Sequence, residues 1–330
     1  MRPIGIVVAA LSLLALGWLL APTAFVGRQL RDAPDAVAAA QPLWLWAAGA
    51  GFVLAVVCAG CAWRSAFRLC GGNMGRVDAC ARYGAGSLVN SLLPFNIGGA
   101  CRVVLFSRAL PADQRLWVAG GVPAAVGAGR ALLMSVLVLA AAGSAALPAW
   151  TALVLLAVGS AAAAVCLWAR HRCAGTGRLS HLLDVFAALG RSPRGALTML
   201  GWLAASVAAR VVAVASVSAA VGLTAPLSTA LVLVPALAVA TLVSLSPAGI
   251  GVTSGAVALV LHQRGVDVTT ALGAGLALNV VEAAAGLATG IASGLILASQ
   301  GVPARRRTLV LAGAAACLVA AAFGVAGFIA

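Results

Sequence analysis

The sequence predicts an all-α, polytopic membrane protein, and three observations support this fold class. Of the 330 residues, 63% are hydrophobic and only 8% are charged, which is more apolar surface than a soluble core hides. The apolar residues form continuous runs instead of alternating with polar ones, so an outer-membrane barrel is not expected. The basic residues concentrate in short connections between these runs, as in helical membrane proteins. We therefore expect about seven to eight spans.

Seven apolar runs are long enough to cross a hydrocarbon core of about 30 Å at ~1.5 Å per helical residue. They comprise residues 4–25, 43–63, 117–139, 150–168, 197–219, 271–297 and 308–329. The first run follows Arg2 and has a cleavable signal peptide as its alternative. We expect it to be a retained span, because its length suffices and it fits the orientation of the later loops.

We expect one membrane domain over residues 1–330, with four consecutive parts. Two spans lie in 1–63, a first half with a broken helix in 64–220, a second such half in 221–300, and a final span in 301–330. The polar connection 170–194 carries leucines at helical spacing, which predicts an amphipathic helix on the inner leaflet, with a plain linker as the alternative.

Orientation follows from arginine, the only basic residue type apart from three histidines. The arginines form three clusters, and the positive-inside rule places all three in the cytoplasm. The clusters are Arg64, Arg68, Arg76 and Arg82; Arg170, Arg172, Arg178, Arg191 and Arg194; and Arg305, Arg306 and Arg307. The intervening connections carry no net positive charge. The prediction is a multi-pass protein of a bacterial inner membrane with a cytoplasmic N-terminus.

Two apolar regions are interrupted by proline and glycine in the same way. In the first, the arms 84–93 and 100–110 are each about half a span long, and Pro94 precedes Ile97 and Gly98. In the second, residues 241–265, the corresponding positions are Pro247, Ile250 and Gly251. The arginine pattern makes the two regions enter from opposite faces. Paired breaks of this kind indicate an inverted-repeat transporter with a midplane site.

Two alternatives to this interpretation remain open. Kinked membrane helices and glycines are common, so the matched pattern has chance as one explanation. Residues 226–245 alone are also long enough to span, which would make the second region one full helix followed by half a helix.

Ionisable residues within spans are costly and indicate functional sites. Three arginines, Arg102, Arg130 and Arg210, accompany one acid, Glu282. The excess positive charge predicts an anionic ligand, and a phosphate suits guanidinium best. Half-helix N-termini near Gly98 and Gly251 would add backbone donors. The structural alternative pairs Arg130 with Glu282 and lets Arg102 or Arg210 extend to the interface.

Other chemistry is not indicated by the sequence. Cys58 and Cys61 form a C-x-x-C without a second pair, so we expect packing rather than a metal or redox role. No paired carboxylates or histidine motif support an enzyme. We expect no cofactor, no metal and no nucleic-acid partner. Gly286, Gly290 and Gly294 share a helix with Glu282 and predict close helix packing.

The stretches "NSLLPFNIGGACRVVL" and "LSPAGIGVTSGAVALVL" resemble the flippase-like membrane domain of lysylphosphatidylglycerol synthases and their stand-alone relatives. The matching positions are Asn90, Pro94, Pro247 and Gly251, over about residues 64–300. The resemblance implies translocation of an anionic or modified phospholipid, or of an isoprenoid-type lipid, between leaflets. The soluble aminoacyl-transferring domain of the synthases does not occur in this sequence, so lipid aminoacylation is not implied.

The sequence departs from the family pattern where acids are usual. Gly99 and Ala100 follow the first motif, Gly129 precedes Arg130, and Thr253 and Ser254 replace an Arg-Glu pair. Any mechanism built on buried carboxylates is therefore in doubt for this chain. Two further functions stay open: a permease for a small water-soluble anion, and a non-catalytic membrane partner of a lipid-modifying enzyme. The lipid, the energy source and the oligomeric state are not predicted.

Overall fold

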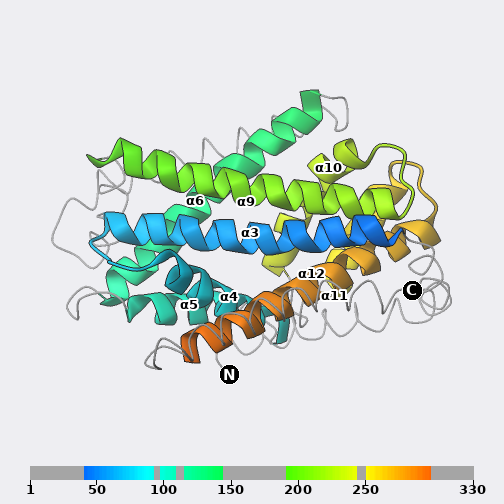
Figure 1. Ribbon diagram of the computed structural model, residues 1–330. Coiled ribbons are helices and arrows are strands. Elements are labelled where there is room, and N and C mark those ends of the chain that lie inside the picture. Colours follow the sequence, from blue (N-terminus) through cyan, green and yellow to red (C-terminus); the bar gives the residue numbers. More distant parts are fainter. Residues whose placement is uncertain (1–40, 93–96, 109–114, 144–190, 244–249, 299–330) are drawn as a thin grey trace, which may run out of the picture.

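The computed structural model describes residues 41–92, 97–108, 115–143, 191–243 and 250–298. Within these ranges all regular structure is helical, in eight α-helices (Figure 1), which confirms the predicted fold class. The spans expected at 4–25, 150–168 and 308–329 lie outside the described residues. So does most of the connection 170–194, in which an amphipathic helix is expected; only residues 191–194 of it are described.

Among the described residues, four helices are long and apolar enough to cross a membrane. They are α3 (Pro42–Leu69), α6 (Arg115–Gly143), α9 (Pro193–Ala220) and α12 (Val268–Ala298). Their 28 to 31 residues correspond to roughly 42–46 Å, which exceeds a hydrocarbon core of about 30 Å. Each contains a predicted span and extends beyond it; α3, for example, continues past Trp63.

Local sequence fixes the ends of these helices. Pro42 and Pro193 occupy the first turn of α3 and α9, where the missing amide costs nothing. Gly71 and Gly222 follow the C-termini of the same helices with φ of +83° and +80°, a conformation that glycine adopts without strain. The amide after Gly222 bonds back to Ser218 at 3.0 Å, which closes the helix and reverses the chain.

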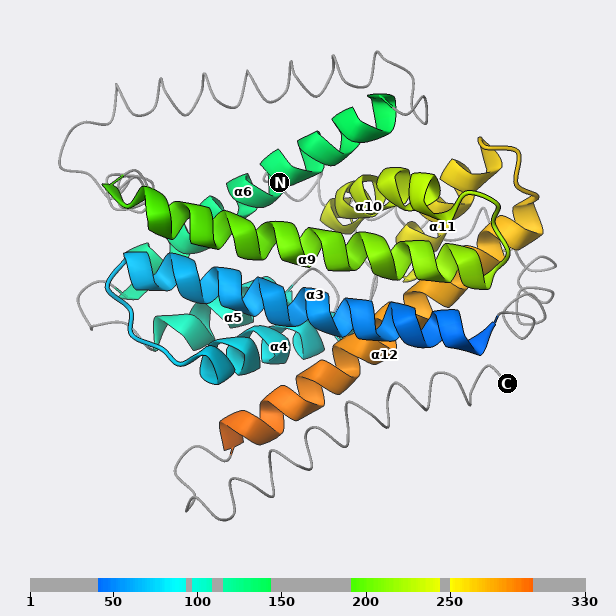
Figure 2. The same cartoon turned by 45° about the horizontal axis from the view of Figure 1, so that its top comes forward.

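Helices α3 and α9 lie side by side and antiparallel (Figures 1 and 2). At one end the Gln41 amide donates to the Ala220 carbonyl at 3.2 Å. At the other end Gly195 contacts Leu69, and a Cβ on that glycine would lie 2.3 Å from the leucine methyl. We call these the Ala220 end and the Leu69 end.

Two helical hairpins enter the bundle from these opposite ends. The first, α4 (Arg76–Leu92) and α5 (Ile97–Ser107), starts at the Leu69 end. The second, α10 (Pro226–Val243) and α11 (Ile250–His262), starts at the Ala220 end (Figure 2). Helices of 11 and 13 residues, such as α5 and α11, reach only about 17–20 Å and cannot span. The predicted inverted arrangement of two broken segments is confirmed.

The hairpins also correct two details of the sequence analysis. Helix α4 begins at Arg76, eight residues before the expected arm, so Arg76 and Arg82 lie on a helix rather than in a loop. Arg64 and Arg68 belong to the end of α3. In the second hairpin α10 has 18 residues, or about 27 Å, so the alternative of a nearly full helix followed by a half helix describes it best.

Small residues allow α12 to cross α4 closely. A Cβ on Gly290 would lie 2.3 Å from the Cβ of Leu88, and one on Gly84 would lie 2.1 Å from the Ser293 hydroxyl. Close approach of backbones is the usual means of helix association in lipid. The predicted packing role holds for Gly290, whereas Gly294 faces open space.

Candidate functional site

The break in the first hairpin is bridged by a side chain. The amide of Gly98, in the first turn of α5, donates to the Asn90 side-chain oxygen on α4 at 2.7 Å. The two helices also approach closely here, because a Cβ on Gly98 would lie 2.1 Å from the Gly86 carbonyl oxygen. Pro94 lies outside the described residues. Asn90 and Gly98, both predicted from sequence, therefore hold the two arms together.

Arg102 is fixed within the first hairpin. Its Nη2 donates to the Ser87 hydroxyl at 3.0 Å and its Nε to the Tyr83 carbonyl at 3.4 Å. Its Cζ lies 4.2 Å from the centre of the Tyr83 ring, within cation–π range. The guanidinium is therefore directed toward α4. The alternative in which Arg102 extends to the membrane interface is wrong.

Arg210 on α9 pairs with Glu282 on α12. Their side chains are 19% and 35% exposed, so the pair is only partly accessible. The alternative from sequence that paired Glu282 with Arg130 is wrong, because α9 rather than α6 places its arginine against the carboxylate. The acid neutralises one guanidinium and links α9 to α12.

Arg130 on α6 is left without such a partner. Its side chain has accessible surface although protein surrounds it on most sides, and the described part of the chain offers it no hydrogen bond or ion pair. It nevertheless interacts electrostatically with Arg210 and Arg102, which repel it, and with Glu282, which attracts it. The three predicted arginines thus lie near enough to interact electrostatically. Among the described residues, Glu282 is the one carboxylate that interacts with Arg130.

The second hairpin carries a buried polar network instead of charges. Thr253 on α11 donates to the Asn279 side-chain oxygen at 2.7 Å, and the Asn279 amide donates to Ser254 at 2.7 Å and to the Gly275 carbonyl at 2.9 Å. All three side chains are at most 7% exposed. Gly251 lies in the first turn of α11, and Pro247 is outside the described residues.

Sequence reasoning did not identify this network. Thr253 and Ser254 counted only as departures from a charged pair, and no role was assigned to Asn279. Tyr83, the aromatic partner of Arg102, was also missed. The available signal was spacing: Asn279 precedes Glu282 by three residues, on nearly the same face of α12.

The described residues contain no group of three or more side chains suited to a metal ion. Cys58 and Cys61 are buried, free thiols, and the Cys61 sulfur lies 3.9 Å from that of Cys80 on α4. Gly60 accommodates this approach, since a Cβ there would lie 2.9 Å from the Cys80 Cα. The thiols sit at a close crossing of α3 and α4.

Comparison with known proteins gives one match. The model of the family described as the lysylphosphatidylglycerol synthase TM region matches residues 4–290. No curated protein and no solved structure matches the chain.

Proposed function

This chain belongs to the lysylphosphatidylglycerol synthase transmembrane-region family, which indicates a lipid-related function in a membrane, and we propose that it translocates a lipid between leaflets. The proposed cargo is an anionic or modified phospholipid, or an isoprenoid-type lipid with a phosphate. Its head group would bind between the two hairpins while its acyl or prenyl chains remain in the bilayer.

The observation that carries this proposal is the charge of Arg130, which has no hydrogen-bond or ion-pair partner among the residues that the structure describes. Arg102 and Arg210 are held by Tyr83, Ser87 and Glu282, whereas Arg130 is exposed. An isolated guanidinium within a membrane is costly. An anion that binds it and screens its repulsion from Arg102 and Arg210 lowers that cost, and phosphate matches guanidinium geometry.

Each part of the site has a distinct role in this mechanism. Arg130 binds the phosphate directly. Arg102 and Arg210 attract the phosphate from fixed positions. Glu282 offsets part of this positive charge, so that the head group is not held too tightly to leave. The Asn90–Gly98 contact keeps α5 aligned. Opposed hairpins provide access from each leaflet in turn, as in other inverted-repeat transporters.

We propose further that the protein is not an enzyme, that its partners are membrane lipids with anionic head groups, and that it resides in a bacterial inner membrane with its N-terminus in the cytoplasm. The cluster of arginines at the Leu69 end supports this orientation through the positive-inside rule.

Reconstitution tests the proposal. The purified chain is placed in vesicles with fluorescent phosphatidylglycerol, and the loss of the outer-leaflet label is followed with a membrane-impermeant quencher. Arg130→Gln removes one charge-assisted contact of about 1.5–3 kcal/mol and should slow translocation roughly ten- to hundredfold. Arg108→Gln, an exposed arginine at the end of α5, is the control and should change the rate less than about twofold.

Equal rates for the two variants would refute the site. Vesicles that release a trapped soluble anion in an Arg130-dependent way, without moving lipid, would instead favour the permease. If lipid moved only when a second membrane enzyme was present beside this chain, the result would favour the partner role.

A further inference from the structure

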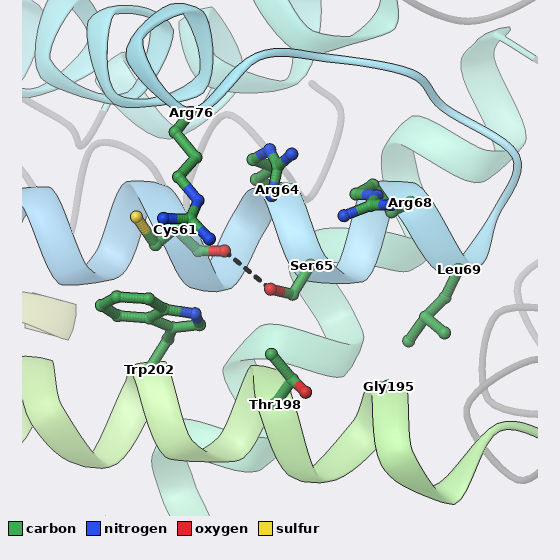
Figure 3. Close-up of a pocket in the computed structure, with 9 residues that line it drawn as sticks. All are labelled: Cys61, Arg64, Ser65, Arg68, Leu69, Arg76, Gly195, Thr198 and Trp202. Carbon is green, nitrogen blue, oxygen red and sulfur yellow. Dashed lines mark hydrogen bonds between the residues drawn. The ribbon is translucent and has the colours of Figure 1, made fainter.

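A basic pocket lies at the Leu69 end, away from the midplane site. It has a volume of about 340 Å³ and lies between the end of α3, the start of α9 and the start of α4 (Figure 3). Its lining includes Arg64, Ser65, Arg68, Arg76, Thr198 and Trp202. Figure 3 shows Arg76 and Trp202 on either side of Cys61, with Arg64 and Arg68 further along α3. We call this the α3–α9 pocket.

Among the residues that the structure describes, the charge around the α3–α9 pocket is entirely positive. Three guanidinium groups line it, and no acidic residue of the described ranges does. The nearby acid Asp78, two positions after Arg76, lies 3.0 Å from Arg82 as an ion pair on α4. The lining arginines therefore attract anions into the pocket.

The donors of this pocket are also available. The Arg64 Nε donates to the Met74 carbonyl at 2.8 Å, which anchors the side chain and leaves its two terminal nitrogens. Arg68 and Arg76 are exposed and make no hydrogen bond or ion pair with residues that the structure describes. Ser65 and Thr198, by contrast, donate to carbonyls of their own helices. The arginines are thus the groups that would bind an anion.

The position of the pocket indicates the source of that anion. Helix α3 measures about 42 Å, some 12 Å more than the hydrocarbon core, so Arg68 and Leu69 in its last turn reach head-group level. Trp202, which is half-buried, belongs to the residue type favoured at this interface. A volume near 340 Å³ is at the small end of ligand pockets and suits a phosphate with its alcohol rather than acyl chains.

We propose that the α3–α9 pocket binds the phosphate of an anionic phospholipid head group in the leaflet at the Leu69 end. Basic pockets between helices bind anionic lipid head groups in other membrane proteins. The pocket and the Arg130 site have no residue in common, so the lipid in the pocket is held in one leaflet and need not be transported. This inference stands without the proposed translocation.

Native mass spectrometry of the full chain tests it. The purified protein is titrated in detergent with short-chain phosphatidylglycerol, with phosphatidylcholine of the same chain length, and with inorganic phosphate. We expect phosphatidylglycerol to bind more tightly than phosphatidylcholine. Arg68→Gln with Arg76→Gln should weaken phosphatidylglycerol binding about tenfold or more.

Two further variants keep the test specific. Arg191→Gln with Arg194→Gln removes the same charge from exposed arginines at the same end that do not line the pocket, and should weaken binding less than about twofold. Thr198→Trp fills the pocket from α9 without changing the net charge and should also abolish selective binding. This variant distinguishes binding inside the pocket from attraction of the lipid by surface charge alone.

Equal weakening by both double variants, or selective binding that survives Thr198→Trp, would overturn the proposal. Pocket-dependent binding of inorganic phosphate without lipid binding would overturn the lipid source. Because the readout is binding, a translocation assay that fails leaves this result unaffected.

Discussion

The side-chain oxygen of Asn90 accepts a hydrogen bond from the Gly98 amide, at 2.7 Å, across the break between α4 and α5. The contact caps α5 from another helix, because amides in the first turn of a helix have no partner within it. It acts at membrane depth, where water is scarce and an unsatisfied amide is expensive.

Asn90→Ala should therefore destabilise the protein. It leaves the Gly98 amide without its acceptor, at a cost of about 1–3 kcal/mol. The midpoint of thermal unfolding in detergent, followed by circular dichroism, measures the effect. Asn73→Ala, in the exposed connection before α4, should leave the midpoint unchanged. Identical midpoints for the two variants would show that the bridge contributes nothing.

Gly290→Val should separate α12 from α4. A Cβ at this position would lie 2.3 Å from the Leu88 Cβ and 3.0 Å from its Cα, and neither atom can move without its backbone. Overpacking of this kind costs about 1–3 kcal/mol. Gly294→Val, four residues later on the same helix and facing open space, is the matched control. Its unfolding midpoint should stay near that of the parent protein. If both variants lowered the midpoint equally, the close contact between α12 and α4 at Gly290 would be contradicted.

Asp267, directly before α12, gives a prediction about pH. The hydroxyl and amide of Thr269 donate to its carboxylate and hold its pKa below the ordinary 3.8. Since folding lowers this pKa, the stabilisation is complete above pH 3.8 and is lost as the pH falls through the folded-state value. Asp267→Asn should lower the unfolding midpoint at neutral pH, and the difference should narrow in acid below pH 3.8. A difference that does not depend on pH would contradict this assignment.

Much of the fold could be predicted because lipid imposes simple length rules. Continuous apolar runs predicted the cores of α3, α6, α9 and α12, and arginine asymmetry predicted that the hairpins enter from opposite sides. The helix ends could not be predicted in the same way. Residues 64–69 continue α3 and residues 76–83 begin α4 despite their charge. For α3 the reason is its length, because a helix longer than the hydrocarbon core carries polar residues on its final turns.

The sequence predicted which ionisable residues lie in the candidate site, but not which of them form an ion pair. Charge within an apolar run identified Arg102, Arg130, Arg210 and Glu282 from sequence alone. Which arginine meets Glu282 depends on how α9 and α6 pack against α12, and helical periodicity carries no such information. The α3–α9 pocket was missed for the same reason, since it combines the ends of three helices.

The Arg210–Glu282 pair provides the last prediction, and it separates stability from transport. Removing one partner leaves the other charge unpaired within the membrane. Arg210→Gln and Glu282→Gln should each cost roughly 1–3 kcal/mol, less than the 3–5 kcal/mol of a fully buried pair because both side chains are partly exposed. The double variant should cost less than the sum, and the difference measures the coupling between the two residues. Arg130→Gln is the matched comparison. Because Arg130 has no ion-pair partner among the described residues and is repelled by Arg102 and Arg210, its loss should leave the unfolding midpoint unchanged or raise it, while slowing lipid translocation. If Arg130→Gln instead destabilised the protein as much as Arg210→Gln, Arg130 would be a structural residue, and the anion site would have to be sought elsewhere.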